Sequence, residues 1–186
     1  MSDSRQPSFA EALEIAGQWI GLWEAGELSD EVLADRVAEL VASRDGARGF
    51  FVVALAGEGP LMDRLPEPLL LALRQAGEPV VDLMVRNLAM SSAMVVAHGR
   101  SGNVEQQQGS ERVQRRALEL LRQLEPLAVK ERLESLLAAT TATPAPRDAN
   151  AAAVAADQTF LDRWSYDPDQ RAAIGAAILA VAENGQ

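Results

Sequence analysis

Hydrophobic residues recur along most of this chain at spacings of three and four, which is the pattern of amphipathic α-helices. The first such segment covers 9–25, with Ser8 placed to cap its start and Gly26 just after its end. Serine or proline also marks the start of later segments, with Ser29 as the cap before 30–43 and Pro126 at the start of 126–137. The pattern predicts about nine helices and no confident strand: 9–25, 30–43, 49–56, 69–76, 79–98, 111–124, 126–137 and two helices within 151–186.

The short apolar run 49–56 fits a buried strand or a buried helix equally well, because periodicity does not decide for so few residues. A lone strand would leave its backbone N–H and C=O groups without partners, and no second strand is evident in the sequence. We therefore predict a helix at this position.

The segment 79–98 is apolar nearly all round, which is typical of a helix in the middle of a bundle. It also contains Asp82, Arg86 and Asn87, so we predict a buried helix of a soluble protein and not a membrane span. Asp82 and Arg86 are four residues apart and can pair on one helical face. These polar residues either bind a polar ligand or partner, or satisfy carbonyl groups of neighbouring helices.

Two segments interrupt the helical pattern. Residues 98–109 contain three glycines and three consecutive glutamines, which predicts a flexible loop before a helix capped by Ser110. Residues 140–150 (TTATPAPRDAN) have the composition of a linker. The predicted organisation is a disordered stretch 1–7, a main helical domain 8–139, the linker 140–150 and a C-terminal helical hairpin 151–186.

The chain shows one internal similarity. Leu-Arg-Gln precedes a Glu-Pro helix start within 73–79 and again within 121–126, at an offset of 48 residues. That offset is near the length of helix-pair repeats, so a repeat-like bundle is one interpretation, and chance in a Leu- and Arg-rich chain is the other.

Composition narrows the function classes. The absence of Cys and the presence of one His argue against disulfides, thiolate catalysis and metal sites built from Cys or His. The formal net charge of −10 is concentrated at the ends, because 1–45 carry ten acidic residues against three Arg, and 147–186 carry six against three. No basic face for nucleic acid is visible. The N-terminus lacks the apolar run of a signal peptide, so we expect a cytoplasmic protein.

The first helix carries two candidate features. Trp19 and Trp23 lie one turn apart and either anchor a partner or fill the core. Ala10, Gly17 and Gly21 form a strip of small residues, which is either a seam for a second copy of the chain or a local weakness of the helix.

Further candidates lie around the apolar segment 79–98. His98 and Arg100 concentrate polar chemistry at the start of the predicted loop, although a helix end followed by a loop is the simpler interpretation. Met84, Met90 and Met94 either line an adaptable pocket or fill the core.

Several stretches of the chain resemble uncharacterised hypothetical proteins of cyanobacteria. This resemblance implies a biological setting and no particular activity. The stretches are Gly49–Leu55, Asn87–Ser91, Gly109–Arg116 and Phe160–Trp164.

We expect a non-enzymatic protein–protein interaction or adaptor protein, since no catalytic motif is found and several helix faces are able to receive a partner. The predicted contact regions are the loop 98–110 and the acidic first two helices. A homodimer is one form of such contact. The alternative is a small-molecule or pigment-binding helical protein with an apolar pocket lined by Met and Trp. No metal, cofactor, nucleic acid or membrane partner is expected.

Overall fold

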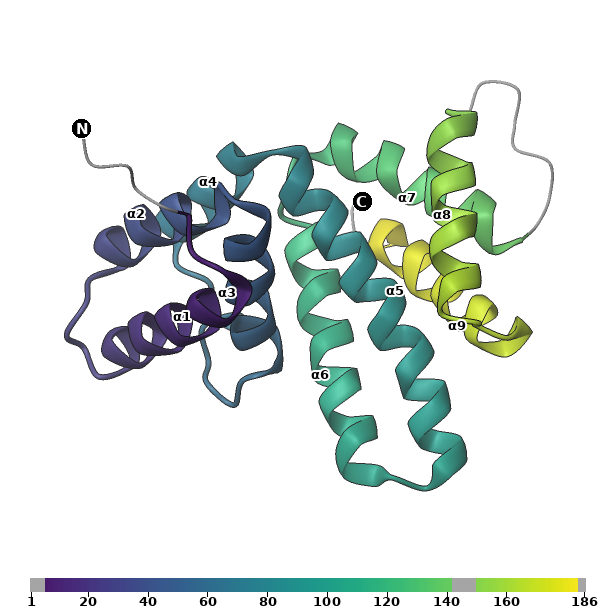
Figure 1. Ribbon diagram of the computed structural model, residues 1–186, viewed down its shortest axis with the longest axis horizontal. Coiled ribbons are helices and arrows are strands. Elements are labelled where there is room, and N and C mark those ends of the chain that lie inside the picture. Colours follow the sequence, from purple (N-terminus) through teal and green to yellow (C-terminus); the bar gives the residue numbers. More distant parts are fainter. Residues whose placement is uncertain (1–5, 142–149, 184–186) are drawn as a thin grey trace. The chain divides into compact units, whose positions relative to one another are not determined.

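The computed structural model describes residues 6–141 and 150–183, and within these residues the chain forms nine α-helices and no strand (Figure 1). The prediction of an all-α bundle is therefore confirmed. The helices are α1 (Phe9–Glu24), α2 (Asp30–Val41), α3 (Arg44–Ala56), α4 (Glu67–Ala76), α5 (Glu78–Ser101), α6 (Val104–Leu121), α7 (Pro126–Thr140), α8 (Ala151–Arg163) and α9 (Pro168–Glu183).

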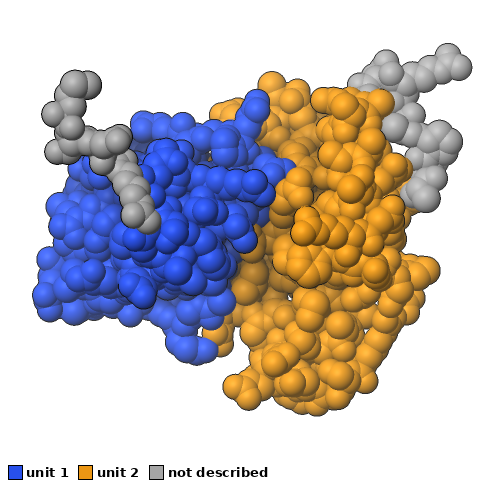
Figure 2. Space-filling model, viewed as in Figure 1, with its two compact units in different colours: residues 1–83 blue, residues 84–186 orange. Residues whose placement is uncertain are grey.

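The chain divides into two compact units, an N-terminal unit of residues 1–83 and a C-terminal unit of residues 84–186 (Figure 2). The division falls within α5, and so inside the predicted main domain 8–139. Most of the predicted disordered stretch 1–7 and of the predicted linker 140–150 lies outside the described residues.

Local hydrogen bonds explain where the helices of the N-terminal unit begin. The Ser8 hydroxyl accepts a bond of 3.3 Å from the Glu11 N–H, and the Glu11 carboxylate accepts one of 2.7 Å from the Ser8 N–H. This reciprocal capping box fixes the start of α1. The Ser29 hydroxyl accepts a bond of 3.3 Å from the Val32 N–H at the start of α2. Both caps are the ones that the sequence predicts.

The ambiguous run 49–56 is helical, as predicted, and belongs to α3. The helix begins earlier than the apolar run because the Ser43 hydroxyl accepts a bond of 3.0 Å from the Gly46 N–H. Phe50 and Phe51 are both buried, with ring centroids 5.0 Å apart in an edge-to-face arrangement.

Helices α1 and α3 pack so closely at Gly49 that no side chain fits there. A Cβ atom at Gly49 would lie 2.5 Å from the Ala12 Cβ atom and 2.9 Å from α1 backbone atoms. By contrast, a Cβ at Gly17 or Gly21 would meet nothing within 4 Å, and both positions are exposed. The small-residue strip of α1 is therefore not the contact between α1 and α3.

In the C-terminal unit, α6 runs back along the second half of α5 (Figure 1), and the Gln114 amide donates a bond of 2.9 Å to the Ser92 hydroxyl. The predicted loop 98–110 is wrong, as is the predicted cap at Ser110. Helix α5 continues to Ser101, and α6 already begins at Val104.

The turn between α5 and α6 is short because Gly102 takes up a left-handed conformation, with φ of +69°. The Asn103 N–H bonds to the His98 carbonyl (3.1 Å), and the Gly102 N–H bonds to the Gly99 carbonyl (3.2 Å). Glutamine favours helices, and a glycine inside a helix costs only about 1 kcal/mol, so Gly99 and Gly109 do not interrupt them.

The last three helices form the rest of the C-terminal unit. Helices α8 and α9 both contact α7, and α9 also contacts α6. Helix α7 begins at Pro126, as predicted. Among the described helices, α5 alone is long and apolar enough to cross a membrane. Half of its most apolar 18-residue stretch is buried.

The glycines of the N-terminal unit give a first prediction. Gly17→Ala and Gly21→Ala should each raise the free energy of unfolding by roughly 0.5–1 kcal/mol, because alanine fits an exposed helix better and restricts the unfolded chain. Gly49→Ala should lower it by about 1–3 kcal/mol through overpacking against Ala12. Urea unfolding of the three variants measures both effects. Destabilisation by alanine at 17 and 21 would instead mean that the strip is covered, as in a dimer.

Candidate functional site

The structure gives both predicted tryptophan anchors partners within their own unit. Trp19 and Trp23 are each partly buried. The Arg36 guanidinium lies 5.6 Å from the centre of the Trp19 ring system, and the Trp23 indole N–H donates a bond of 2.7 Å to the Asp30 carboxylate. Since Arg36 and Asp30 belong to α2, both rings help to join α1 to α2.

The polar residues predicted on α5 do not form one site within a single unit. Asp82 belongs to the N-terminal unit, whereas Arg86 and Asn87 belong to the C-terminal unit. All three side chains are partly buried. The Arg86 guanidinium lies 5.0 Å from the centre of the Phe160 ring of α8, which is a cation–π contact.

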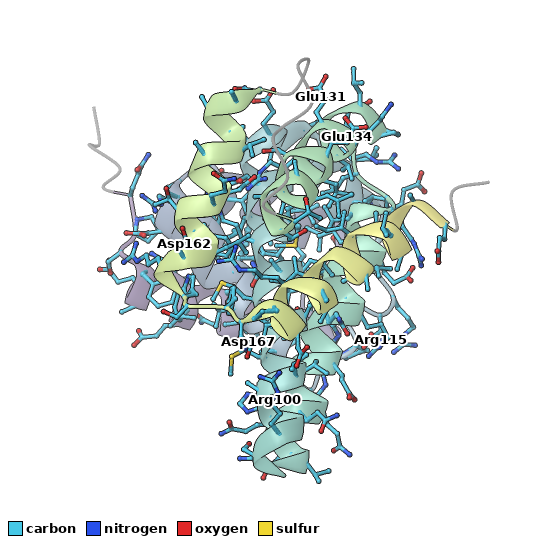
Figure 3. All side chains as sticks on the ribbon, turned by 90° about the vertical axis from the view of Figure 1, so that its right-hand side faces the viewer. Arg100, Arg115, Glu131, Glu134, Asp162 and Asp167 are labelled. Carbon is cyan, nitrogen blue, oxygen red and sulfur yellow. The ribbon has the colours of Figure 1, made fainter. Side chains whose placement is uncertain are left out.

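His98 and Arg100 lie in the last turn of α5, where positive charge favours the helix dipole. The partly buried His98 contributes its backbone carbonyl to the turn that follows. The Arg100 guanidinium donates bonds of 2.5 Å to Asp167 and 2.5 Å to Asp169, at the start of α9. Figure 3 shows Arg100 close to Asp167.

We call residues 160–171 the α8–α9 corner. They comprise the end of α8, the connection that follows it and the start of α9. Helix α8 ends in a Schellman motif, in which Ser165 has a φ of +53°. The Ser165 N–H bonds to the Asp162 carbonyl (2.9 Å), and the Tyr166 N–H bonds to the Leu161 carbonyl (3.3 Å). Serine is unusual at this position, which glycine usually occupies.

The aromatic residues on the two sides of Ser165, where the chain reverses, differ in exposure. Tyr166 is buried and meets Phe160 edge to face, with ring centroids 6.4 Å apart. Trp164 is left 52% exposed. The corner therefore presents a large aromatic ring to solvent on a backbone fixed by hydrogen bonds.

Further bonds hold the corner in shape and against α5. The Asp167 carboxylate caps α9 by accepting a bond of 3.0 Å from the Gln170 N–H, and the Gln170 amide donates one of 3.2 Å to the Ala93 carbonyl of α5. The Arg171 guanidinium donates bonds of 2.9 Å to the Tyr166 carbonyl and 2.7 Å to the Asp162 carboxylate.

The ion pair at Arg100 changes the titration of its partner. The hydrogen bond between the two side chains lowers the pKa of Asp167 below its ordinary value. The same bond raises the pKa of Arg100. A carboxyl group with a lowered folded-state pKa stabilises the fold above its unfolded pKa, and this contribution is lost as the pH falls through the folded-state pKa. Burial raises the pKa of the Tyr166 phenol.

A buried carboxylate joins α8 to α7. Asp157 is 1% exposed and accepts bonds of 2.7 and 2.8 Å from the Arg132 guanidinium and one of 2.8 Å from the Ser135 hydroxyl. This bidentate pair satisfies a charge that would be costly to bury alone. Over the described ranges, no group of three or more acidic or His side chains is placed to hold a metal ion.

The sequence does not single out the exposed ring at the corner. Phe160 and Trp164 are four residues apart, which places both on one face of a helix. Trp164 is the C-cap residue of α8, and its N–H still bonds to the Phe160 carbonyl (3.4 Å), yet Phe160 is buried and Trp164 is exposed. The Ser-Tyr-Asp-Pro sequence that follows is a usable signal, since Asp167-Pro168 starts a new helix and places the reversal just before it.

Comparison with known proteins gives one family. The family model that matches is described as Uncharacterised conserved protein UCP020893, and the match covers residues 8–181. No curated protein and no solved structure matches the chain.

The buried cluster gives a second prediction. Asp157→Asn should lower the free energy of unfolding by about 3 kcal/mol, at the low end for a broken buried ion pair because Arg132 retains some solvent contact. The double variant Asp157→Leu/Arg132→Met should be clearly more stable than Asp157→Leu alone. Chemical unfolding of the wild type, Asp157→Leu, Arg132→Met and the double variant measures the coupling. Additive effects would show that the pair does not stabilise the packing of α8 on α7.

Proposed function

The chain belongs to the family described as Uncharacterised conserved protein UCP020893, and we propose that it is a non-enzymatic protein-interaction or adaptor protein. The observation that supports this proposal is Trp164, a tryptophan 52% exposed on a backbone that is fixed from both sides. Tryptophan is enriched among the residues that carry most of the binding energy at protein interfaces.

Three properties of the α8–α9 corner suit it to this role. The ring offers a large apolar area with one N–H donor, which is typical of an interface anchor. Its backbone is held by the Schellman motif, so little chain entropy is lost on binding. The three carboxylates at 162, 167 and 169 pair with Arg171 and Arg100, so their negative charge is compensated before a partner binds.

The partner that fits these properties is a protein with an apolar pocket or groove large enough for an indole ring. We propose that the complex forms in the cytoplasm of a cyanobacterium, in keeping with the resemblance of several stretches to cyanobacterial proteins. Self-association is the competing form of contact, and its test is the dependence of molecular mass on protein concentration.

A second candidate function is the binding of a small apolar molecule or pigment. It is favoured by the methionines of α5, since Met84 is buried, Met90 is partly buried and Met94 is exposed, so the side chains extend from the core to the surface. Purified protein that is coloured, or whose melting temperature rises with an added ligand, would support this function over the first.

The interaction proposal predicts a partner that depends on Trp164. Full-length protein, tagged and recovered from its native host at low salt, should retain one stoichiometric partner that Trp164→Ala loses, with a loss in affinity of roughly 30-fold or more for an interface anchor. The melting temperature should change little, because the ring is exposed.

The matched control is Leu179→Ala. Leu179 is 53% exposed and lies on α9 about 15 Å along the helix from Asp169. This variant should retain the partner. Equal retention of a partner by the wild type and by Trp164→Ala would contradict the role of the corner, and recovery of only copies of the same chain would replace the adaptor by a homo-oligomer.

A further inference from the structure

We propose that Arg100 is a salt-sensitive clasp that fastens the α8–α9 corner to the end of α5 and thereby sets how Trp164 is presented. The regulatory meaning of the clasp rests on the proposed function, whereas its effect on the corner is a property of the fold alone. Both can therefore be tested separately.

The clasp joins two segments that are far apart in the sequence. The Arg100 guanidinium reaches two carboxylates at once, Asp167 at the cap of α9 and Asp169 in its first turn. A planar guanidinium suits this arrangement, because its donors point along fixed directions. The short turn at Gly102 ends α5 directly after Ser101, so Arg100 lies in the last turn of the helix.

Helix dipoles favour the same contact. Arg100 lies at the C-terminal end of α5, where the dipole attracts positive charge, and Asp167 and Asp169 lie at the N-terminal end of α9, where it attracts negative charge. Each group stabilises its own helix and also meets the opposite charge of the other helix. The contact is therefore a specific junction between two helix ends.

The clasp is exposed to solvent, in contrast to the attachment of α8 to α7. The side chains of Arg100, Asp167 and Asp169 are 47%, 41% and 79% exposed, whereas the Asp157 side chain is 2% exposed. Dissolved salt screens exposed charges strongly and buried pairs weakly. Raising the ionic strength should therefore loosen the corner at α5 while α8 stays attached to α7.

Loosening at α5 would change the surroundings of residues within the corner itself. Gln170 would release the Ala93 carbonyl, and the buried Tyr166 would gain access to water. Trp164 precedes both on the same short segment, so its orientation would no longer be fixed relative to α5.

Hydrogen exchange measures the clasp directly. In the full chain at low salt, Arg100→Gln should speed amide exchange in residues 160–171 by roughly three- to tenfold, the range for removing two exposed ion pairs. Added sodium chloride at about 1 M should speed wild-type exchange in the same segment and have little further effect on Arg100→Gln. If salt speeds exchange in the wild type but has little effect once Arg100 is replaced, Arg100 is the salt-sensitive group.

Tyr166 supplies a second measurement, because it is the only tyrosine of the chain. Its phenol should titrate above the ordinary tyrosine pKa in the wild type, because it is buried, and closer to the ordinary value in Arg100→Gln. Absorbance of the phenolate at alkaline pH reports this difference without a partner.

Arg48→Gln is the control, since it removes an exposed pair with Asp45, together with a contact to the Phe9 ring, in the N-terminal unit. It should leave exchange in 160–171 and the titration of Tyr166 unchanged. If amides at 160–171 exchanged in Arg100→Gln at the same rate as in the wild type, the proposed clasp would be overturned. An effect of Arg100→Gln on exchange, with no effect on any partner, would retain the clasp and remove only its link to the proposed function.

Discussion

In the C-terminal unit, the packing of α8 on α7 depends on a buried charge, the carboxylate of Asp157. A carboxylate removed from water is tolerated only where opposite charge and hydrogen-bond donors replace the water, and Arg132 and Ser135 of α7 supply both. Because these donors are directional, they fix the position of α8 along α7 more closely than apolar contacts would. The place where α8 ends, and hence the position of the exposed tryptophan that follows it, depends on this pair.

Beside the contacts of Phe160 with Arg86 and of Gln170 with Ala93, two ion-pair clusters that differ in exposure hold the helices of the α8–α9 corner. The Asp157 cluster is buried and attaches α8 to α7. The Arg100 pairs are exposed to solvent and attach the start of α9 to α5. Between the two attachments the chain reverses at Ser165, buries Tyr166 and exposes Trp164. A surface with one salt-sensitive attachment suits the proposed role in protein interaction. It also explains why exposed charge and exposed aromatic area occur together at this corner.

The sequence predicts the helices well and the site poorly, for a physical reason. Caps such as Ser8 and Ser29, and the proline start of α7, are local interactions that a short window of sequence contains. The break predicted at 98–110 is wrong because glycine and glutamine, although typical of loops in such numbers, are tolerated by helices whose ends are well capped. The sequence marks Arg100 as a candidate, but its partners lie 67 and 69 residues away, beyond the reach of any local pattern.

Photo-crosslinking shows whether the surface at Trp164 contacts another protein. A photoreactive phenylalanine analogue would replace Trp164 in one version of the full chain and Leu179 in another, and both would be irradiated in cells of the native host. If Trp164 lies in an interface, position 164 should form a crosslink to one other protein and position 179 should form none. No crosslink from 164, or the same products from both positions, would contradict it.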